Sequence, residues 1–389
     1  RTKIIEWLAP INFFQRQADI SRARQPGTGG WLLEDGRFKQ WEAGSQRILW
    51  CRGIPGSGKT ILASMVVDHL EAQFDDQDMC VACMYLNHKE RDTQTVSNLL
   101  ASIWSQVVVD KTISSLAQKL HERHSKKRTQ PKLDEVSEVL RLAVAEWGRV
   151  YIVVDALDEY PEDERNMLLR HLIAMGPHVS LMLTSRPHID LGVTLPDPGL
   201  LDVRATDEDI KKYVNERIRK SSRLSMHVQT RPELPDEIES KIISTVDGMF
   251  LLAKLHIDSL ATKNTIKSVR GALENLPKDL EHTYDEAMER IDRQNEDDRK
   301  IAHSALTWVA NAKRVLSARE LREALAIEPE AERLDPDNLL EVTIILSVCA
   351  GLLIFDETSS AVRLVHYTTQ KYMDSARESR FPAAHTQIT

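Results

Sequence analysis

The chain has 389 residues, of which 42% are hydrophobic and 28% are charged. This balance is typical of a globular protein and excludes a disordered or fibrous one, and the length allows about two to four domains. The formal net charge of −8 disfavours a broad binding surface for DNA or RNA, so we expect no nucleic-acid partner. No apolar stretch approaches the roughly 20 residues of a transmembrane helix, so we expect no membrane partner. Because the first residue is Arg1 rather than Met, we expect a fragment that lacks its natural N-terminus.

Cysteine is rare, and three of the four cysteines lie inside apolar runs, where a thiol packs as a small hydrophobic group. Cys80 and Cys83 form a CxxC pair, but no second pair or nearby histidine cluster completes a zinc site. We therefore interpret this pair as part of a core strand. The cysteine usage favours a reducing, cytoplasmic location.

Residues 1–46 mix aromatic and polar positions around the turn-rich stretch 25–30, and we interpret them as a lead-in to the next domain. From Ile48 onward, short apolar runs alternate with helical patterns, which predicts a parallel sheet covered by helices on both faces. The fold class is therefore α/β, with a five-stranded parallel sheet. The five runs are Ile48–Cys51, Cys80–Leu86, Val150–Val154, Leu181–Leu183 and Leu200–Val203.

Between the second and third runs lies a basic segment, residues 121–128. No aromatic residues are interleaved with its charges, as they would be in many nucleic-acid surfaces, so we interpret it as a solvated loop.

The strand signal fades after about residue 205, and helical patterns dominate the rest of the chain. Thr206 followed by Asp209 resembles an N-cap that starts a helix. Near the end, helices are followed by two short strand-like runs, Leu352–Phe355 and Val362–Val365. Helices followed by a short hairpin predict a winged-helix domain.

The strongest motif is GIPGSGKT, which fits the pattern G-x-x-x-x-G-K-[ST] between a strand and a helix. Its glycines let backbone N–H groups turn toward phosphates, and the helix N-terminus adds positive potential. Lys59 is expected to reach the β and γ oxygens, and Thr60 to bind Mg²⁺. The sequence therefore predicts a site for ATP or GTP with Mg²⁺, built from Gly53, Pro55, Gly56, Ser57, Gly58, Lys59 and Thr60.

A P-loop site also needs a carboxylate for the metal, and Asp155 stands at the end of an apolar strand. Asp158 and Glu159 follow in the loop that leaves this strand, where they could orient or deprotonate the attacking water. Taken alone, such an acidic cluster is usually a solvated loop, but its position after a P-loop and a buried strand favours catalysis.

The next strand, Val179–Leu183, is followed by the segment Thr184-Ser185-Arg186-Pro187. Arg186 is suited to a bidentate contact with the γ-phosphate, and the alternative is an arginine in a surface salt bridge.

The motifs GIPGSGKT, VVDALDE and LTSRP together resemble the NACHT class of STAND NTPases, and especially its fungal members. Three further stretches extend the resemblance over nearly the whole chain: Gly27–Leu33, Leu276–Leu280 with Tyr284, and Leu364–Tyr367 with Gln370 and Tyr372. The resemblance implies a helical domain and a winged-helix domain after the NTPase domain.

In related receptors, the winged-helix histidine contacts the β-phosphate, which implies this role for His366; the alternative is a purely structural histidine. Relatives often carry Gly-x-Pro near the adenine, whereas this chain has Gly248-Met249-Phe250.

The domains implied are a lead-in over 1–46, a NACHT P-loop NTPase domain over 47–205, a helical domain over 206–294, a winged-helix domain over 295–380 and the start of a truncated extension over 381–389.

The resemblance implies a signalling switch of the NOD-like receptor type, closed with a diphosphate and open with a triphosphate, with slow hydrolysis as its timer. It also implies self-oligomerisation on activation, and roles in innate immunity or heterokaryon incompatibility. The N-terminal effector and C-terminal ankyrin or WD sensor repeats of relatives are absent from this chain. Two alternatives stay open: a nucleotide-binding scaffold without significant hydrolysis, and a conventional P-loop NTPase, although no LSGGQ-like or NKxD segment occurs.

Overall fold

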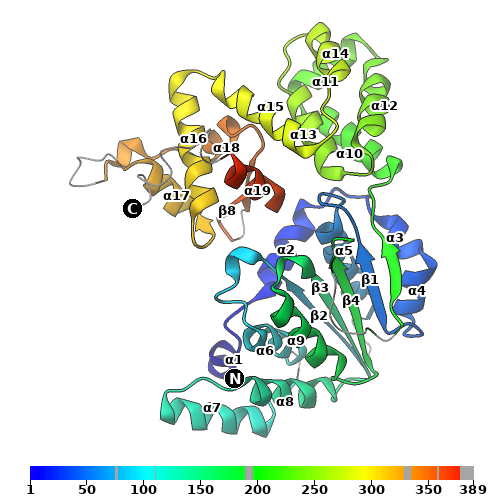
Figure 1. The fold of residues 1–389 in the computed structure, drawn as a ribbon, viewed down its shortest axis with the longest axis vertical. Coiled ribbons are helices and arrows are strands. Elements are labelled where there is room, and N and C mark those ends of the chain that lie inside the picture. Colours follow the sequence, from blue (N-terminus) through cyan, green and yellow to red (C-terminus); the bar gives the residue numbers. More distant parts are fainter. Residues whose placement is uncertain are drawn as a thin grey trace. The chain divides into compact units, whose positions relative to one another are not determined.

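The computed structural model describes residues 1–74, 78–109, 111–187, 189, 195, 197–327, 334–356 and 359–376. The chain divides into two compact units. The first comprises Arg1–Ile54 and Gly58–Val203, and the second comprises Pro55–Ser57 and Arg204–Thr389. Figure 1 shows the elements of both units. The predicted extension over 381–389 lies outside the described residues.

The first unit is built on a five-stranded parallel sheet with the strand order β2-β3-β4-β1-β5. The predicted α/β fold is confirmed, and each predicted apolar run is one of these strands. Strands β3 and β4 are almost entirely buried because helices cover both faces of the sheet. The strands are β1 (Ile48–Arg52), β2 (Met79–Tyr85), β3 (Arg149–Asp155), β4 (Val179–Ser185) and β5 (Gly199–Asp202).

Strand β1 pairs with β4 on one side and with β5 on the other, although both come later in the chain. Strand β4 also pairs with β3, so the carboxyl ends of β1, β3 and β4 are neighbours. In open parallel sheets, ligands bind at this edge, where the order of the strands changes direction. The sheet therefore brings together the segments that follow these three strands.

Helix α5 (Lys59–Phe74) packs on one face of the sheet, and helices α6 (Val96–Val107), α8 (Leu133–Val144) and α9 (Glu162–Ile173) cover the opposite face (Figure 1). A single apolar core joins these helices to the sheet. The CxxC cysteines, Cys80 and Cys83, are both buried in β2, as the sequence predicted.

The lead-in residues form four helices that belong to the core of the first unit: α1 (Thr2–Leu8), α2 (Phe13–Ala23), α3 (Gly30–Glu34) and α4 (Gly36–Glu42). Helix α2 packs along α5 through a largely buried polar network. The amide nitrogen of Gln17 donates to Asp68 Oδ1 at 2.7 Å, and Ser21 Oγ donates to Asp68 Oδ2 at 2.5 Å. The hydroxyl of Tyr85 in β2 donates to Gln17 Oε1, so the lead-in is bonded to both the sheet and α5.

The prediction of a solvated loop over 121–128 is wrong, because residues through Lys127 belong to helix α7 (Ser115–Lys127). The charges conceal a helical stripe in which Ala117, Leu120 and His124 are buried at a spacing of three to four residues. The ring of His124 lies 6.1 Å from that of Trp7, and its Nε2 lies 3.1 Å from Glu135 Oε2. The segment is therefore a docked helix with one charged face.

Among its described residues, the second unit contains two apolar cores. One lies within its helical part, and the other lies in its C-terminal part and also includes Leu251 and Leu255. Thr206 caps α10 as predicted, since its hydroxyl oxygen accepts from the N–H of Asp209 at 3.1 Å. The helical part consists of α10 (Asp207–Lys220), α11 (Ser222–Thr230), α12 (Leu234–Val246), α13 (Phe250–Leu260) and α14 (Ile266–Glu274).

The C-terminal part combines helices with a three-stranded antiparallel sheet of order β6-β8-β7. The predicted hairpin is present as β7 (Leu353–Asp356) and β8 (Ala361–Leu364), and the winged-helix prediction is confirmed. Strand β6 (Leu316–Ser317) was not predicted, because two residues carry no alternating pattern. The helices are α15 (Leu280–Asp292), α16 (Glu296–Asn311), α17 (Ala318–Leu325), α18 (Val342–Val348) and α19 (Tyr367–Ser375).

Within the described ranges, none of the helices combines the length and the apolarity that a membrane span requires.

Gly29 and Gly30 provide a matched test of how the lead-in is packed. Gly29 has φ of 83°, and a Cβ there would lie 2.8 Å from Leu62 Cδ2 and 3.1 Å from Met65 Sδ. Gly30 is in α3, and a Cβ there meets nothing within 4 Å. We expect Gly29→Ala to lower the free energy of unfolding by about 1–2 kcal/mol, and Gly30→Ala to be neutral or stabilising. Urea denaturation measures both, and equal effects would contradict this packing.

Candidate nucleotide site

The P-loop connects the end of β1 to the start of α5, and its turn depends on glycine. Gly56 and Gly58 have φ of 74° and 97°, in the left-handed region that other residues rarely adopt. A Cβ on Gly58 would meet nothing within 4 Å, so the loop has open space beside it. Because α5 begins at Lys59, the positive end of that helix lies at the loop.

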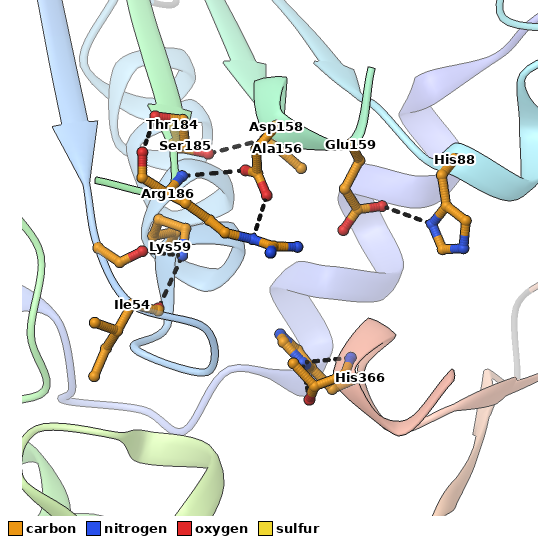
Figure 2. Close-up of polar contacts among 12 residues, drawn as sticks. Ile54, Lys59, His88, Ala156, Asp158, Glu159, Thr184, Ser185, Arg186 and His366 are labelled. Atoms are coloured by element: carbon orange, nitrogen blue, oxygen red, sulfur yellow. Dashed lines mark hydrogen bonds and ion pairs between the residues drawn. The ribbon is translucent and has the colours of Figure 1, made fainter. Parts of the chain in front are cut away.

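Lys59 is held by the loop that precedes it. Its Nζ donates to the carbonyl oxygens of Gly53 at 2.8 Å and Ile54 at 3.0 Å (Figure 2). Burial lowers the pKa of Lys59, while the carboxylates of Asp158 and Asp155 oppose this shift. The ammonium group is therefore bonded to the loop and lies near the carboxylates of Asp155 and Asp158.

Asp155 ends strand β3 as a buried carboxylate with a hydroxyl on each oxygen. Thr60 Oγ1 donates to Asp155 Oδ2 at 2.8 Å, and Thr184 Oγ1 donates to Asp155 Oδ1 at 2.6 Å. Burial raises the pKa of Asp155, and the hydrogen bonds from Thr184 and Thr60 act in the opposite direction. The two predicted metal ligands, Thr60 and Asp155, are thus in direct contact.

The acidic turn after β3 forms the short helix η2 (Leu157–Glu159), and it begins at Ala156 with φ of 60°. Asp158 is bound to the end of β4 in two ways. Its Oδ2 lies 2.7 Å from Arg186 Nε, and its Oδ1 accepts from the backbone N–H of Arg186 at 3.2 Å (Figure 2). Two predicted catalytic residues therefore form an ion pair with each other, and only 7% of the Asp158 side chain is exposed.

Glu159 is the third predicted catalytic residue, and it points toward a partner on the neighbouring strand end. Its Oε2 lies 3.4 Å from Nδ1 of His88, in the short helix η1 (His88–Glu90) after β2 (Figure 2). His88 gives no signal in the sequence, because nothing in its local pattern links it to the acids after β3.

The residues at this edge fit Mg²⁺ and a nucleotide. The Ser57 hydroxyl is buried and has no hydrogen-bond partner among the described residues, so the loop retains a polar group for an oxygen-rich ligand. Thr60 and Asp155 offer the oxygen ligands that Mg²⁺ prefers. Within the described ranges, no group of three or more histidine, cysteine or carboxylate side chains could hold a metal.

His366 belongs to the second unit, where it caps helix α19. Its Nδ1 accepts from the backbone N–H of Thr368 at 3.2 Å and lies 2.8 Å from Thr368 Oγ1. The surrounding motif packs on α15, because Thr368 Oγ1 lies 2.7 Å from the hydroxyl of Tyr284, and Tyr372 donates to Asp285 Oδ1 at 2.6 Å. The imidazole orientation is thus fixed by local contacts.

The connection between α14 and α15 contains the predicted Leu276–Leu280 motif. Burial lowers the pKa of His256 in α13 to about 4, so its imidazole is neutral at physiological pH. Its Nε2 donates to the carbonyl oxygen of Pro277 at 2.9 Å and fastens the connection to the helical part.

Two family models match separate parts of the chain. The family described as Nephrocystin 3, N-terminal, matches residues 27–186, and the family described as GPI inositol-deacylase, winged helix domain, matches residues 288–383.

Among curated proteins, the vegetative incompatibility protein HET-E-1 of Podospora anserina is 24% identical over 356 residues, which are 88% of this chain and 26% of that protein. Among solved structures, a signal transduction ATPase with numerous domains (STAND) and a tetratricopeptide repeat sensor, from Pyrococcus horikoshii, aligns with a TM-score of 0.50 and 13% identity. That alignment covers 91% of this chain and 44% of the archaeal chain. This chain therefore spans about a quarter of the first protein and less than half of the second.

The fold and the P-loop edge define the class of a P-loop NTPase with helical and winged-helix parts. Within that class, the motifs, the two family matches, the likeness to HET-E-1 and the fold of the archaeal protein support a NACHT-type STAND NTPase. The resemblance inferred from the sequence motifs is confirmed.

The buried charge of Asp155 gives a prediction with a definite sign. Burial raises the pKa of Asp155 in the folded state, so protonation of this carboxyl stabilises the fold. This contribution is complete below the unfolded-state pKa of about 3.9, and it is lost as the pH rises through the folded-state pKa. In EDTA and without nucleotide, we expect Asp155→Asn to unfold at a higher temperature than the wild type at pH 8. This advantage should shrink as the pH falls toward about 4.

Differential scanning fluorimetry across this pH range measures the effect. The matched control is Asp202→Asn, since 73% of that side chain is exposed. A midpoint for Asp155→Asn at or below that of the wild type at pH 8 would contradict the energetic cost assigned to this carboxylate.

Proposed function

We propose that the chain is a nucleotide-controlled signalling switch that binds and slowly hydrolyses ATP or GTP. The observation that carries the proposal is the contact between Thr60 and Asp155, at 2.8 Å, beside the ammonium group of Lys59. A hydroxyl and a carboxylate in contact at the start of a P-loop helix are the protein ligands that a Mg²⁺–nucleotide complex uses.

Each residue has a role in this proposal. The backbone of Gly53, Pro55, Gly56, Ser57 and Gly58 would surround the phosphates, and Lys59 would neutralise the β and γ oxygens. Thr60 and Asp155 would hold Mg²⁺, which, when bound, offsets the charge that develops on the phosphates. Asp158 and Glu159 would orient or deprotonate the attacking water, and Arg186 would contact the γ-phosphate.

The ion pair between Asp158 and Arg186 supports slow turnover rather than rapid catalysis. Both carboxylate oxygens of Asp158 are engaged by Arg186, one by its Nε and one by its backbone N–H, so neither is free to take a proton from water. The pair must open before Asp158 accepts a proton and Arg186 turns to a phosphate. This favours a timer over a metabolic enzyme, although a conventional P-loop NTPase and a scaffold without hydrolysis remain alternatives that turnover measurements separate.

The similarity to HET-E-1 supports placing the switch in a fungal NOD-like receptor with a role in vegetative incompatibility. In that setting the chain would act in the cytoplasm, together with an N-terminal effector and C-terminal sensor repeats, and would self-associate on activation. The domain limits that accompany the proposal are 47–205 for the NTPase domain, 206–294 for the helical domain and 295–380 for the winged helix.

Lys59→Ala tests the proposed site directly. Removing the ammonium group is expected to abolish the thermal stabilisation that ATP, ADP, GTP or GDP gives with Mg²⁺, which is about 2.7 kcal/mol at 100 times the dissociation constant. The control is Lys39→Ala, because Lys39 lies outside the P-loop and forms an exposed ion pair with Glu34. The rate of phosphate release from the wild type then separates the three candidate functions. Slow release supports the switch, fast release supports a conventional NTPase, and no release supports a scaffold. The same affinity in Lys59→Ala and wild type, measured by calorimetry, would refute the site.

His366 tests the proposed latch between the winged helix and the diphosphate. Loss of the imidazole should speed diphosphate release, and a stopped-flow chase of a fluorescent ADP or GDP measures that rate. His366→Leu removes both the imidazole and the cap of α19, whereas His366→Asn keeps a capping side chain. Faster release in both variants supports the latch; faster release in the leucine variant alone would show that only the cap matters.

A further inference from the structure

Thr184 stands at the carboxyl end of β4, between the metal ligand Asp155 and the start of the acidic turn. Its side chain is fully buried, with 0% exposure, so it cannot contact a bound nucleotide. Its hydroxyl nevertheless takes part in two hydrogen bonds. It donates to Asp155 Oδ1 at 2.6 Å. It also accepts from the backbone N–H of Ala156 at 2.9 Å (Figure 2).

These two bonds have a fixed direction. A hydroxyl has one hydrogen, and an ionised carboxylate can only accept. Because the N–H of Ala156 donates to the Thr184 oxygen, the hydroxyl hydrogen is directed at Asp155. Thr60 donates to the other carboxylate oxygen, so Thr184 holds the plane of the Asp155 carboxylate in the orientation that presents that oxygen to Thr60.

The bond to Ala156 adds a second effect. Ala156 has φ of 60°, a conformation that costs a residue with a Cβ about 1 kcal/mol or more. Thr184 satisfies the N–H of this strained residue, which immediately precedes Leu157, Asp158 and Glu159. One hydroxyl thus fixes both the carboxylate rotamer and the starting point of the turn that carries the proposed catalytic acids.

We propose that Thr184 is a positioning residue of the magnesium site, acting through Asp155 and Ala156 rather than on the nucleotide itself. The inference rests on the proposed nucleotide-binding function. Removal of a group that orients a metal ligand typically lowers metal affinity about 10–100-fold. The loss should therefore appear in the part of nucleotide affinity that depends on Mg²⁺.

The test is calorimetric titration of ADP and GDP into each variant, once in EDTA and once in saturating Mg²⁺. For Thr184→Val, which keeps the shape but lacks the hydroxyl, we expect the Mg²⁺-dependent gain in affinity to fall about 10-fold or more, with unchanged affinity in EDTA. Thr184→Ser restores the hydroxyl and should keep most of the gain. Ser180→Ala, which removes a buried hydroxyl from the same strand, is the control and should match the wild type.

Two outcomes overturn the inference while sparing the proposed function: a full Mg²⁺-dependent gain in Thr184→Val, or an equal loss of affinity in EDTA and in Mg²⁺. Absence of nucleotide binding in the wild type overturns both. If Thr184→Val does not fold, Thr184→Cys carries the same comparison, because its S–H group is only a weak donor. A smaller Mg²⁺-dependent gain in Thr184→Cys supports the role, and an unchanged gain refutes it.

Discussion

The buried carboxylate of Asp155, held by one threonine on each oxygen, is the interaction on which the nucleotide edge depends. It links elements at the ends of three strands, since Asp155 ends β3, Thr184 is the next-to-last residue of β4, and Thr60 lies in the first turn of the helix that follows β1. A buried charge is costly unless hydrogen bonds and nearby opposite charge compensate it. The neighbouring Lys59 and the two hydroxyls supply part of that compensation, although burial still raises the pKa of the carboxyl. The uncompensated part of the charge is what a bound cation would neutralise.

The sheet order explains why these groups meet. Because β1 is inserted between β4 and β5, the P-loop emerges beside the strand end that carries Thr184 and Arg186, and β3 adds the acids on the far side of β4. The rigid buried strands set the positions, and short turns supply the reactive groups. Such a division between a stiff frame and functional loops is general in parallel α/β folds.

Much of this was readable from the sequence, because long apolar runs and the P-loop pattern are strong local signals. The five strands, the winged helix and the family followed from them. The pairing of Asp158 with Arg186 did not, because it depends on which strand ends are neighbours. Thr184 gave no signal either, since a threonine at a strand end is ordinary until Asp155 is placed beside it. The basic helix over 121–127 was missed because its charge outweighed a short buried stripe.

The hydrogen-bond network between α2 and α5 indicates that the folding unit of the nucleotide domain begins earlier in the chain than its motifs suggest. The Nephrocystin-type match starts at residue 27, and the first strand at Ile48, yet α2 lies before both. Phe13 is buried against the ring of Tyr85, and Gln17 bonds to Asp68 on the helix that follows the P-loop. A truncation at either apparent boundary would expose one side of α5 and leave Asp68 without these donors. The smallest autonomous piece therefore includes residues that carry no recognisable motif.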